Sequence, residues 1–86
     1  MLKKTVTIQN PSGLHARPAS MFVQKATGFP CEIHIIKGTK TVNGKSIMGL
    51  MSLAIAKGDE ITLETSGERE QEALDELAKI LEAVHE

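Results

Sequence analysis

The chain has no tryptophan, no tyrosine and only two phenylalanines among its 86 residues. Proteins that bind single-stranded nucleic acid on a sheet stack the bases on exposed aromatic rings, and this chain lacks the side chains for such a platform. A nucleic-acid-binding domain is therefore disfavoured, although the N-terminal part of the chain is basic. We expect no direct nucleic-acid partner.

Cysteine and long apolar runs are also scarce. Cys31 is the single cysteine, which excludes an internal disulfide and a metal site built from several thiolates, and the sequence has no cluster of metal ligands. No apolar run reaches the ~18 residues of a membrane span, and the start of the chain lacks the apolar core of a signal peptide. These absences predict a cytoplasmic protein without membrane insertion.

The net charge of −1 conceals an uneven distribution. Residues 1 to 57 carry eight Lys or Arg and one acid, a charge of +7, whereas residues 58 to 86 carry −8. Two interpretations stay open. In the first, the acids only solvate a C-terminal helix; in the second, the basic part forms a functional face that attracts an anionic ligand or an acidic partner protein.

What is present is the composition of a globular protein, with 41% hydrophobic and 24% charged residues, and it predicts a single domain over residues 1–86. Alternating apolar and polar residues predict strands at residues 2 to 8, 31 to 35, 40 to 42 and 61 to 65. Helical spacing predicts helices at residues 16 to 27, over about two turns after residue 46, and at 69 to 84. The order βαββαβα predicts an α+β fold, an open-faced β-sandwich in which a four-stranded antiparallel sheet carries three helices on one face.

The stretch GLHARPA, residues 13 to 19, places His15 directly ahead of a predicted helix. The backbone N–H groups of a first helical turn, here those of Ala16 and Arg17, point toward the positive end of the helix dipole and favour an anion. A neutral imidazole is nucleophilic near pH 7, and a phosphoryl group on nitrogen is labile enough to be passed on. Such a site can hold a phosphoryl group beside His15, toward which the Arg17 guanidinium can turn. Taken alone, a histidine beside a helix start is more often a plain surface or capping residue.

This stretch resembles, position for position, the active-site signature of HPr, the histidine phosphocarrier family of the bacterial sugar phosphotransferase system. The stretch KSIMGLMSL, residues 45 to 53, resembles that family's regulatory serine segment, and the predicted element order agrees over essentially the whole chain. The resemblance implies that Nδ1 of His15 accepts a phosphoryl group from phospho-Enzyme I and donates it to sugar-specific EIIA domains. It also implies a monomeric carrier that is not an independent enzyme and holds no cofactor.

Ser46 precedes the predicted short helix, where a serine commonly caps the helix through its hydroxyl. The resemblance implies a second role, because HPr proteins of low-GC Gram-positive bacteria are phosphorylated here by HPr kinase/phosphorylase. That form is a corepressor with the catabolite control repressor. A helix dipole favours a phosphate at this position, so the two roles are compatible. Gly44 departs from the alanine or leucine of many family members, and we expect it to loosen the approach to Ser46.

The short helix has more apolar residues than one buried stripe needs. With Leu50 and Leu53 facing the core, the remaining apolar side chains are expected to point outward, although methionines at helical spacing also serve as core filler. Flexible methionine-rich surfaces suit a protein that meets several partners. The predicted partner-binding surface comprises Ser20, Met21, Gln24, Lys45, Ile47, Met48 and Met51, with Arg17, Lys45 and Lys25 around an apolar centre.

The alternative function is a purely regulatory binding module that works through Ser46 alone. Regulatory HPr-like paralogues lack the histidine, so His15 favours the carrier. An independent catalyst is not expected, because nothing in the sequence forms a substrate pocket with a separate acid and base. No role is assigned to His34 or His85, and Asn10 and Ser12 are expected to shape the loop around His15.

Overall fold

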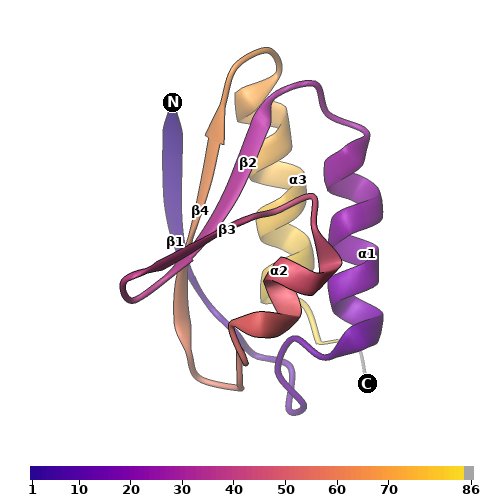
Figure 1. Cartoon of the computed structure of the whole chain (residues 1–86), viewed down its shortest axis with the longest axis vertical. Coiled ribbons are helices and arrows are strands. Elements are labelled where there is room, and N and C mark those ends of the chain that lie inside the picture. The colour runs from indigo at the N-terminus through magenta and orange to yellow at the C-terminus, as the bar shows by residue number, and fades with distance from the viewer. Residues whose placement is uncertain (85–86) are drawn as a thin grey trace.

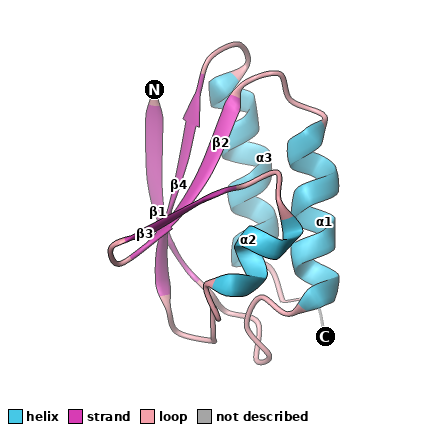
Figure 2. Cartoon of the chain, viewed as in Figure 1, coloured by secondary structure: helices cyan, strands magenta, loops and turns pink. Residues whose placement is uncertain are grey.

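The structure is a computed structural model that describes residues 1–84. Three helices cover one face of a four-stranded antiparallel sheet, and the other face is open (Figures 1 and 2). This confirms the predicted open-faced sandwich. The elements are β1 (Leu2–Thr7), α1 (Ala16–Thr27), β2 (Glu32–Lys37), β3 (Lys40–Asn43), α2 (Ile47–Ser52), β4 (Glu60–Ser66) and α3 (Glu70–Glu82).

Helix α1 has the predicted bounds, whereas α3 is shorter at both ends than residues 69 to 84. Arg69 has φ 63°, a left-handed conformation that cannot continue a right-handed helix, so α3 begins one residue later. At the other end Ala83 is already extended, with ψ 155°. None of the helices described within residues 1–84 has the length and hydropathy of a membrane span.

The order of the strands in the sheet is β1-β4-β2-β3, so the last strand of the chain lies between the first two. In β4 the buried residues Ile61, Leu63 and Thr65 alternate with more exposed ones, because successive side chains of a strand point to opposite faces. The buried side packs beneath α1 and α3, whose inward stripes include Phe22 and Leu77, both fully buried. The second phenylalanine, Phe29, is also buried at 5% exposure, so neither ring offers a stacking platform.

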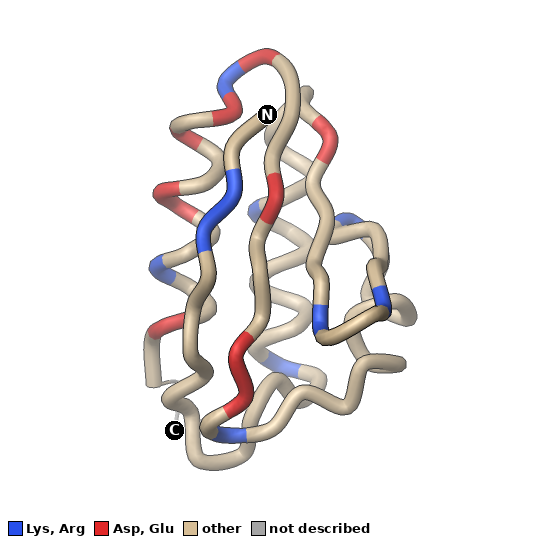
Figure 3. The backbone as a smooth tube through the Cα atoms, turned by 90° about the vertical axis from the view of Figure 1, so that its left-hand side faces the viewer, with Lys and Arg blue, Asp and Glu red and all other residues tan. Residues whose placement is uncertain are grey.

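This topology also brings the two oppositely charged parts of the sequence together (Figure 3). Strand β1 pairs with β4 and lies near α3, so basic residues of the N-terminal part meet acids of the C-terminal part. A separate basic face is therefore weakened by ion pairs within the fold. These pairs are Lys3 with Glu64 at 3.5 Å, Lys4 with Glu82 at 3.6 Å and Lys37 with Asp59 at 3.0 Å.

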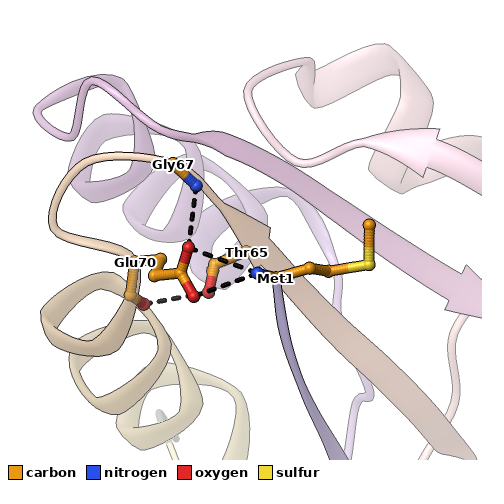
Figure 4. A network of polar contacts seen from close by, with 4 residues as sticks. All are labelled: Met1, Thr65, Gly67 and Glu70. Carbon is orange, nitrogen blue, oxygen red and sulfur yellow. Dashed lines mark hydrogen bonds and ion pairs between the residues drawn. The ribbon is translucent and has the colours of Figure 1, made fainter.

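At the end of the molecule where the chain begins, Glu70 joins three segments (Figure 4). Its carboxylate lies 3.2 Å from the amino group of Met1 and accepts a 3.0 Å hydrogen bond from the Gly67 N–H. Its carbonyl oxygen accepts a 2.9 Å hydrogen bond from the Thr65 hydroxyl. The Gly67 N–H, followed by the Met1 ammonium, lowers the pKa of Glu70. This network lies at the opposite end of α1 from the loop that leads into that helix (Figure 1).

Candidate functional site

The loop that leads into α1 is held by hydrogen bonds of its own. Asn10 is buried, at 2% exposure, and its Nδ2 donates to the Gly13 carbonyl at 3.0 Å, while the Gly13 N–H donates to the Asn10 carbonyl at 2.8 Å. The Leu14 N–H donates to the Ile55 carbonyl at 3.1 Å. Asn10 therefore shapes the loop as expected, whereas Ser12 is exposed at its tip.

Gly13 meets two separate requirements. Its φ of +68° lies in the left-handed region, and its α-carbon lies directly against the chain at Ile55 and Ala56. A Cβ at this position would clash with the Ile55 carbonyl oxygen and lie 2.8 Å from the Ala56 Cα. The close approach requires a residue without a side chain. It also fixes the position of the loop ahead of His15 relative to Ile55 and Ala56.

His15 is the N-cap of α1, with an extended backbone at φ −78° and ψ −173°. Its carbonyl accepts the first helical hydrogen bond, from the Ala19 N–H at 3.0 Å, but its imidazole makes no capping bond within the described chain. The side chain is half-buried, whereas Ala16 and Arg17 beside it are exposed. Pro18 is the third helical residue, where its missing N–H removes no helical bond.

The structure thus brings the predicted His15, Ala16 and Arg17 together at the electropositive end of a helix of 12 residues. An anion placed there is favoured by the amides of Ala16 and Arg17 and by the guanidinium of Arg17, which is on the first turn. His15 directly precedes this first turn and is partly exposed. This arrangement suits a phosphoryl group that binds to and leaves the ring.

Ser46 is the N-cap of α2 and makes the capping bond that His15 does not. Its Oγ accepts from the Gly49 N–H at 3.2 Å, and its carbonyl accepts from the Leu50 N–H at 3.1 Å. The predicted cap is confirmed. The Ser46 side chain is half-buried and at the start of a helix that packs on α1.

Gly44 does not loosen the approach to Ser46, so this expectation is wrong. Gly44 is buried, and its N–H donates to the Ile33 carbonyl at 2.7 Å. A Cβ there would lie 2.5 Å from Ile33 Cγ2 and 3.2 Å from Phe22 Cε1. The absent side chain lets the backbone pack closely against β2 and α1, which holds the chain ahead of α2 in place.

The outward apolar side chains are confirmed. Leu50 and Leu53 are buried, whereas four large apolar residues of α1 and α2 are exposed, so these four do not fill the core. We call them the apolar set; they are Met21 at 41% exposure, Ile47 at 37%, Met48 at 81% and Met51 at 44%. Gln24 is also exposed on α1, and Ser20 is half-buried.

Lys45, one of the cations predicted around this set, has its side chain bound by a backbone carbonyl. Its Nζ donates to the Phe29 carbonyl at 2.8 Å, which ties the side chain to the loop that follows α1. Arg17 is on the first turn of α1, at the other end of that helix. The Phe29 carbonyl attracts the ammonium, and a role of Lys45 in partner binding stays a prediction.

Of the two remaining histidines, His34 is among the described residues and His85 is not. His34 lies on the open face of the sheet, where its Nδ1 is 3.7 Å from Glu64 Oε1. His85 lies outside the described residues.

No motif in the sequence indicates the segment on which the His15 loop rests, residues 53 to 59. Its Ile55 carbonyl receives the Leu14 N–H, and the Lys37 ammonium lies against its first two carbonyls. These contacts join residues far apart in the chain through backbone atoms. Side-chain periodicity carries no signal for them.

The fold and the His15 site together define a small open-faced α+β domain with a partly exposed histidine at a helix start. The family model described as the PTS HPr component phosphorylation site matches residues 2–83. The chain belongs to the HPr family of phosphocarrier proteins.

Individual relatives fall into two groups. The chain is 54% identical over 82 residues to the HPr-like protein Crh of Halalkalibacterium halodurans, covering 95% of this chain and 98% of that protein. It is 49% identical over 81 residues to the phosphocarrier protein HPr of Neisseria meningitidis, covering 94% and 91%. The crystal structure of a phosphocarrier protein HPr from Bacillus anthracis has a TM-score of 0.90 and 49% identity, covering 94% of this chain and 96% of that one. Overall sequence identity therefore does not distinguish the Crh relatives from the HPr relatives. The distinction has to come from individual residues.

Proposed function

We propose that the protein carries phosphoryl groups on His15 from phospho-Enzyme I to sugar-specific EIIA domains. The observation that carries this proposal is the position of His15, accessible and beside Ala16 and Arg17 at the start of α1. Regulatory paralogues of the family lack this histidine, so its presence favours the carrier over a module that works through Ser46 alone.

In the proposed transfer, a nitrogen of the neutral imidazole attacks phosphorus. The new P–N bond forms as the bond between phosphorus and Enzyme I breaks, and a second transfer reverses these roles toward EIIA. The amides of Ala16 and Arg17 and the Arg17 guanidinium stabilise the negative oxygens. Each partner completes the reacting site, so the protein is a carrier and not an independent catalyst.

The test is incubation of the purified protein with phosphoenolpyruvate and Enzyme I. We expect an acid-labile, base-stable phosphate that the His15→Ala variant does not acquire. The matched control is His34→Ala, which removes a histidine from the open face of the sheet and should label like the wild type. A wild-type protein that stays unlabelled would reject the carrier and leave the regulatory module.

A second function is supported by Ser46, which is a half-buried cap and resembles the regulatory serine of the family. We propose that HPr kinase/phosphorylase modifies its hydroxyl and that the product is a corepressor with the catabolite control repressor. The phosphate adds a charge of about −1.5 to −2 next to Ile47 and Met48 of the apolar set. Docking to Enzyme I through that set should then weaken.

Kinase treatment tests this second function, with Ser46→Ala as the variant that should lose the phosphate. Ser52→Ala is the matched control, because Ser52 is an exposed serine of the same short helix. Phosphate on Ser52, or on both serines, would contradict the assignment to Ser46.

The apolar set is the proposed docking surface for these partners. Small, transient contacts suit a shuttle, and an exposed methionine such as Met48 adapts to differently shaped surfaces. Met48→Ala should raise the concentration of protein that half-saturates Enzyme I, without loss of stability. The control, Lys40→Ala, truncates an exposed side chain on the β2–β3 hairpin and should leave that concentration unchanged.

We propose a cytoplasmic monomer, because β1 pairs with β4 of its own chain over the whole length of the strand. A crystal structure of Bacillus subtilis Crh is an intertwined dimer with a swapped domain, and an HPr of Thermoanaerobacter tengcongensis has also been solved as a dimer. Light scattering coupled to gel filtration distinguishes the two states. A mass of twice 9.3 kDa would replace the monomer with a dimer of this kind.

A further inference from the structure

The segment that supports the His15 loop contains a backbone conformation that an alanine rarely adopts. Ala54, just after α2, has φ +49°, and such left-handed residues other than glycine persist only where their surroundings impose them. The next residue, Ile55, presents its carbonyl to the Leu14 N–H, one position ahead of His15. The turn at Ala54 thus aims the acceptor that locates the start of α1.

The Lys37 ammonium contacts the backbone on both sides of this turn. Its Nζ donates to the Leu53 carbonyl at 3.0 Å and to the Ala54 carbonyl at 3.1 Å, the two carbonyls on either side of the Ala54 α-carbon. Two successive carbonyls that share one cation have a fixed relative orientation, which fixes the backbone at Ala54. The third acceptor near Nζ is Asp59 Oδ2 at 3.0 Å, so the three protons of the ammonium have three partners.

Asp59 completes the support from the other end of the segment. The same Oδ2 accepts the Ala56 N–H at 2.8 Å, and the Asp59 N–H donates to the Ala56 carbonyl at 3.0 Å. The Asp59 carbonyl also receives the Ile8 N–H at 3.0 Å, which anchors the turn to the end of β1. The pKa of the Asp59 carboxyl is lowered by the Ala56 N–H and by Lys37, so the carboxylate is charged at neutral pH.

We propose that Lys37, assisted by Asp59, is a positioning residue for phosphoryl transfer at His15. It holds the left-handed turn at Ala54, and the turn holds the Ile55 carbonyl under the loop that enters α1. Lys37 acts through backbone atoms and does not touch the phosphoryl group. The expected effect of Lys37 on the transfer rate rests on the proposed carrier function. The claim that Lys37 positions the loop rests on the hydrogen bond from Leu14 to Ile55 alone.

The test compares Lys37→Met with Lys40→Met, which removes an exposed lysine of the same hairpin. For Lys37→Met we expect the maximal rate of His15 phosphorylation by Enzyme I to fall about tenfold, as small misplacements of a reacting group do. The protein concentration at half-maximal rate should stay constant, because the apolar set is intact. Amide hydrogen exchange of Leu14 should accelerate about tenfold, whereas Lys40→Met should match the wild type in every measurement.

Two rescues separate positioning from general destabilisation. Lys37→Arg keeps donors and charge and should restore most of the rate. Adding Ala54→Gly to Lys37→Met should also recover rate and Leu14 protection, because glycine adopts the left-handed turn without a tether. A folded Lys37→Met protein with wild-type rate and wild-type Leu14 exchange would overturn the proposal, as would a double variant no better than Lys37→Met.

Further measurements separate the positioning role of Lys37 from the proposed carrier function. If Lys37→Met does not fold, Asp59→Asn removes one charge of the cluster and should produce a smaller change of the same kind; no change would reject the proposal. If the wild-type protein acquires no phosphate, the carrier function fails. Leu14 exchange in the variants then still decides whether Lys37 positions the loop.

Discussion

The two helices that carry the candidate phosphorylation sites begin in different ways. Ser46 caps α2 with its own hydroxyl, at 3.2 Å from the Gly49 N–H, whereas the His15 imidazole makes no such bond to α1 in the described structure. A cap stabilises a helix by about 1 kcal/mol, so the start of α1 forgoes a contribution that α2 receives. The Ser46 side chain therefore stabilises the start of α2 in a way that the His15 side chain does not stabilise the start of α1.

The chain ahead of each N-cap shows the same contrast. A glycine precedes each cap by two residues, Gly13 before His15 and Gly44 before Ser46, and both pack too closely for an ordinary Cβ. Only Gly13 has a positive φ, and its neighbours are backbone atoms of residues 55 and 56. The neighbours of Gly44 include the Ile33 and Phe22 side chains, which can adjust. The approach to His15 is therefore the more rigid of the two.

The largest expected effect follows from that rigidity. Gly13→Ala should lower the free energy of unfolding by about 3 kcal/mol, because the new Cβ strains the left-handed backbone and meets the Ile55 carbonyl. Urea denaturation followed by circular dichroism measures the change. Gly44→Ala is the matched variant and should cost about 1 kcal/mol, since side chains can move aside. Equal losses would show that the two approaches do not differ in rigidity.

Substitution of the two N-cap residues, Ser46 and His15, should change the stability of the protein in opposite directions. Ser46→Ala should destabilise the protein by about 1 kcal/mol, because the Gly49 N–H loses its acceptor. His15→Asp should stabilise it by about 1 kcal/mol, because a carboxylate can cap the first turn of α1 and complement its dipole. Thermal unfolding at pH 7 measures both changes.

The same pair of variants separates stability from activity. His15→Asp should lose phosphorylation by Enzyme I completely while gaining stability, whereas Ser46→Ala should keep the phosphorylation and lose stability. A destabilised His15→Asp protein would mean that the imidazole already contributes to the start of α1 as much as a cap does.

Much of this difference between the starts of α1 and α2 could be predicted from the sequence. The features that could not be predicted have a common cause. Capping chemistry and the period of α1 predict both N-caps and the exact bounds of that helix, because these depend on neighbours in the chain. The turn at Ala54 and the packing of Gly44 depend on backbone atoms of other elements. Lys45 illustrates the same limit, since the Phe29 carbonyl that attracts it is distant in sequence and has no side-chain signature.

The smallest expected effect is the response to acid, which compares the two ends of the molecule. At the His15 end, the Ala56 N–H and Lys37 lower the pKa of Asp59; at the far end, the Gly67 N–H lowers that of Glu70 and Arg69 lowers that of Glu72. A carboxyl group with a lowered pKa in the folded state contributes stability above its pKa in the unfolded chain, about 4, and this contribution is lost as the pH falls through the folded value. Stability should therefore be flat near neutrality and decline below about pH 4.

Single variants assign this decline to one end or the other. Asp59→Asn and Glu70→Gln should each flatten the dependence of unfolding free energy on pH below about pH 4, and only Asp59→Asn should also accelerate Leu14 exchange at neutral pH. Urea denaturation at several pH values and exchange measured by NMR provide the two readouts. A local anchor at residues 53 to 59 would not transmit a change from the opposite end of α1. If Glu70→Gln accelerates Leu14 exchange as much as Asp59→Asn does, the support of the His15 loop therefore extends through the whole fold.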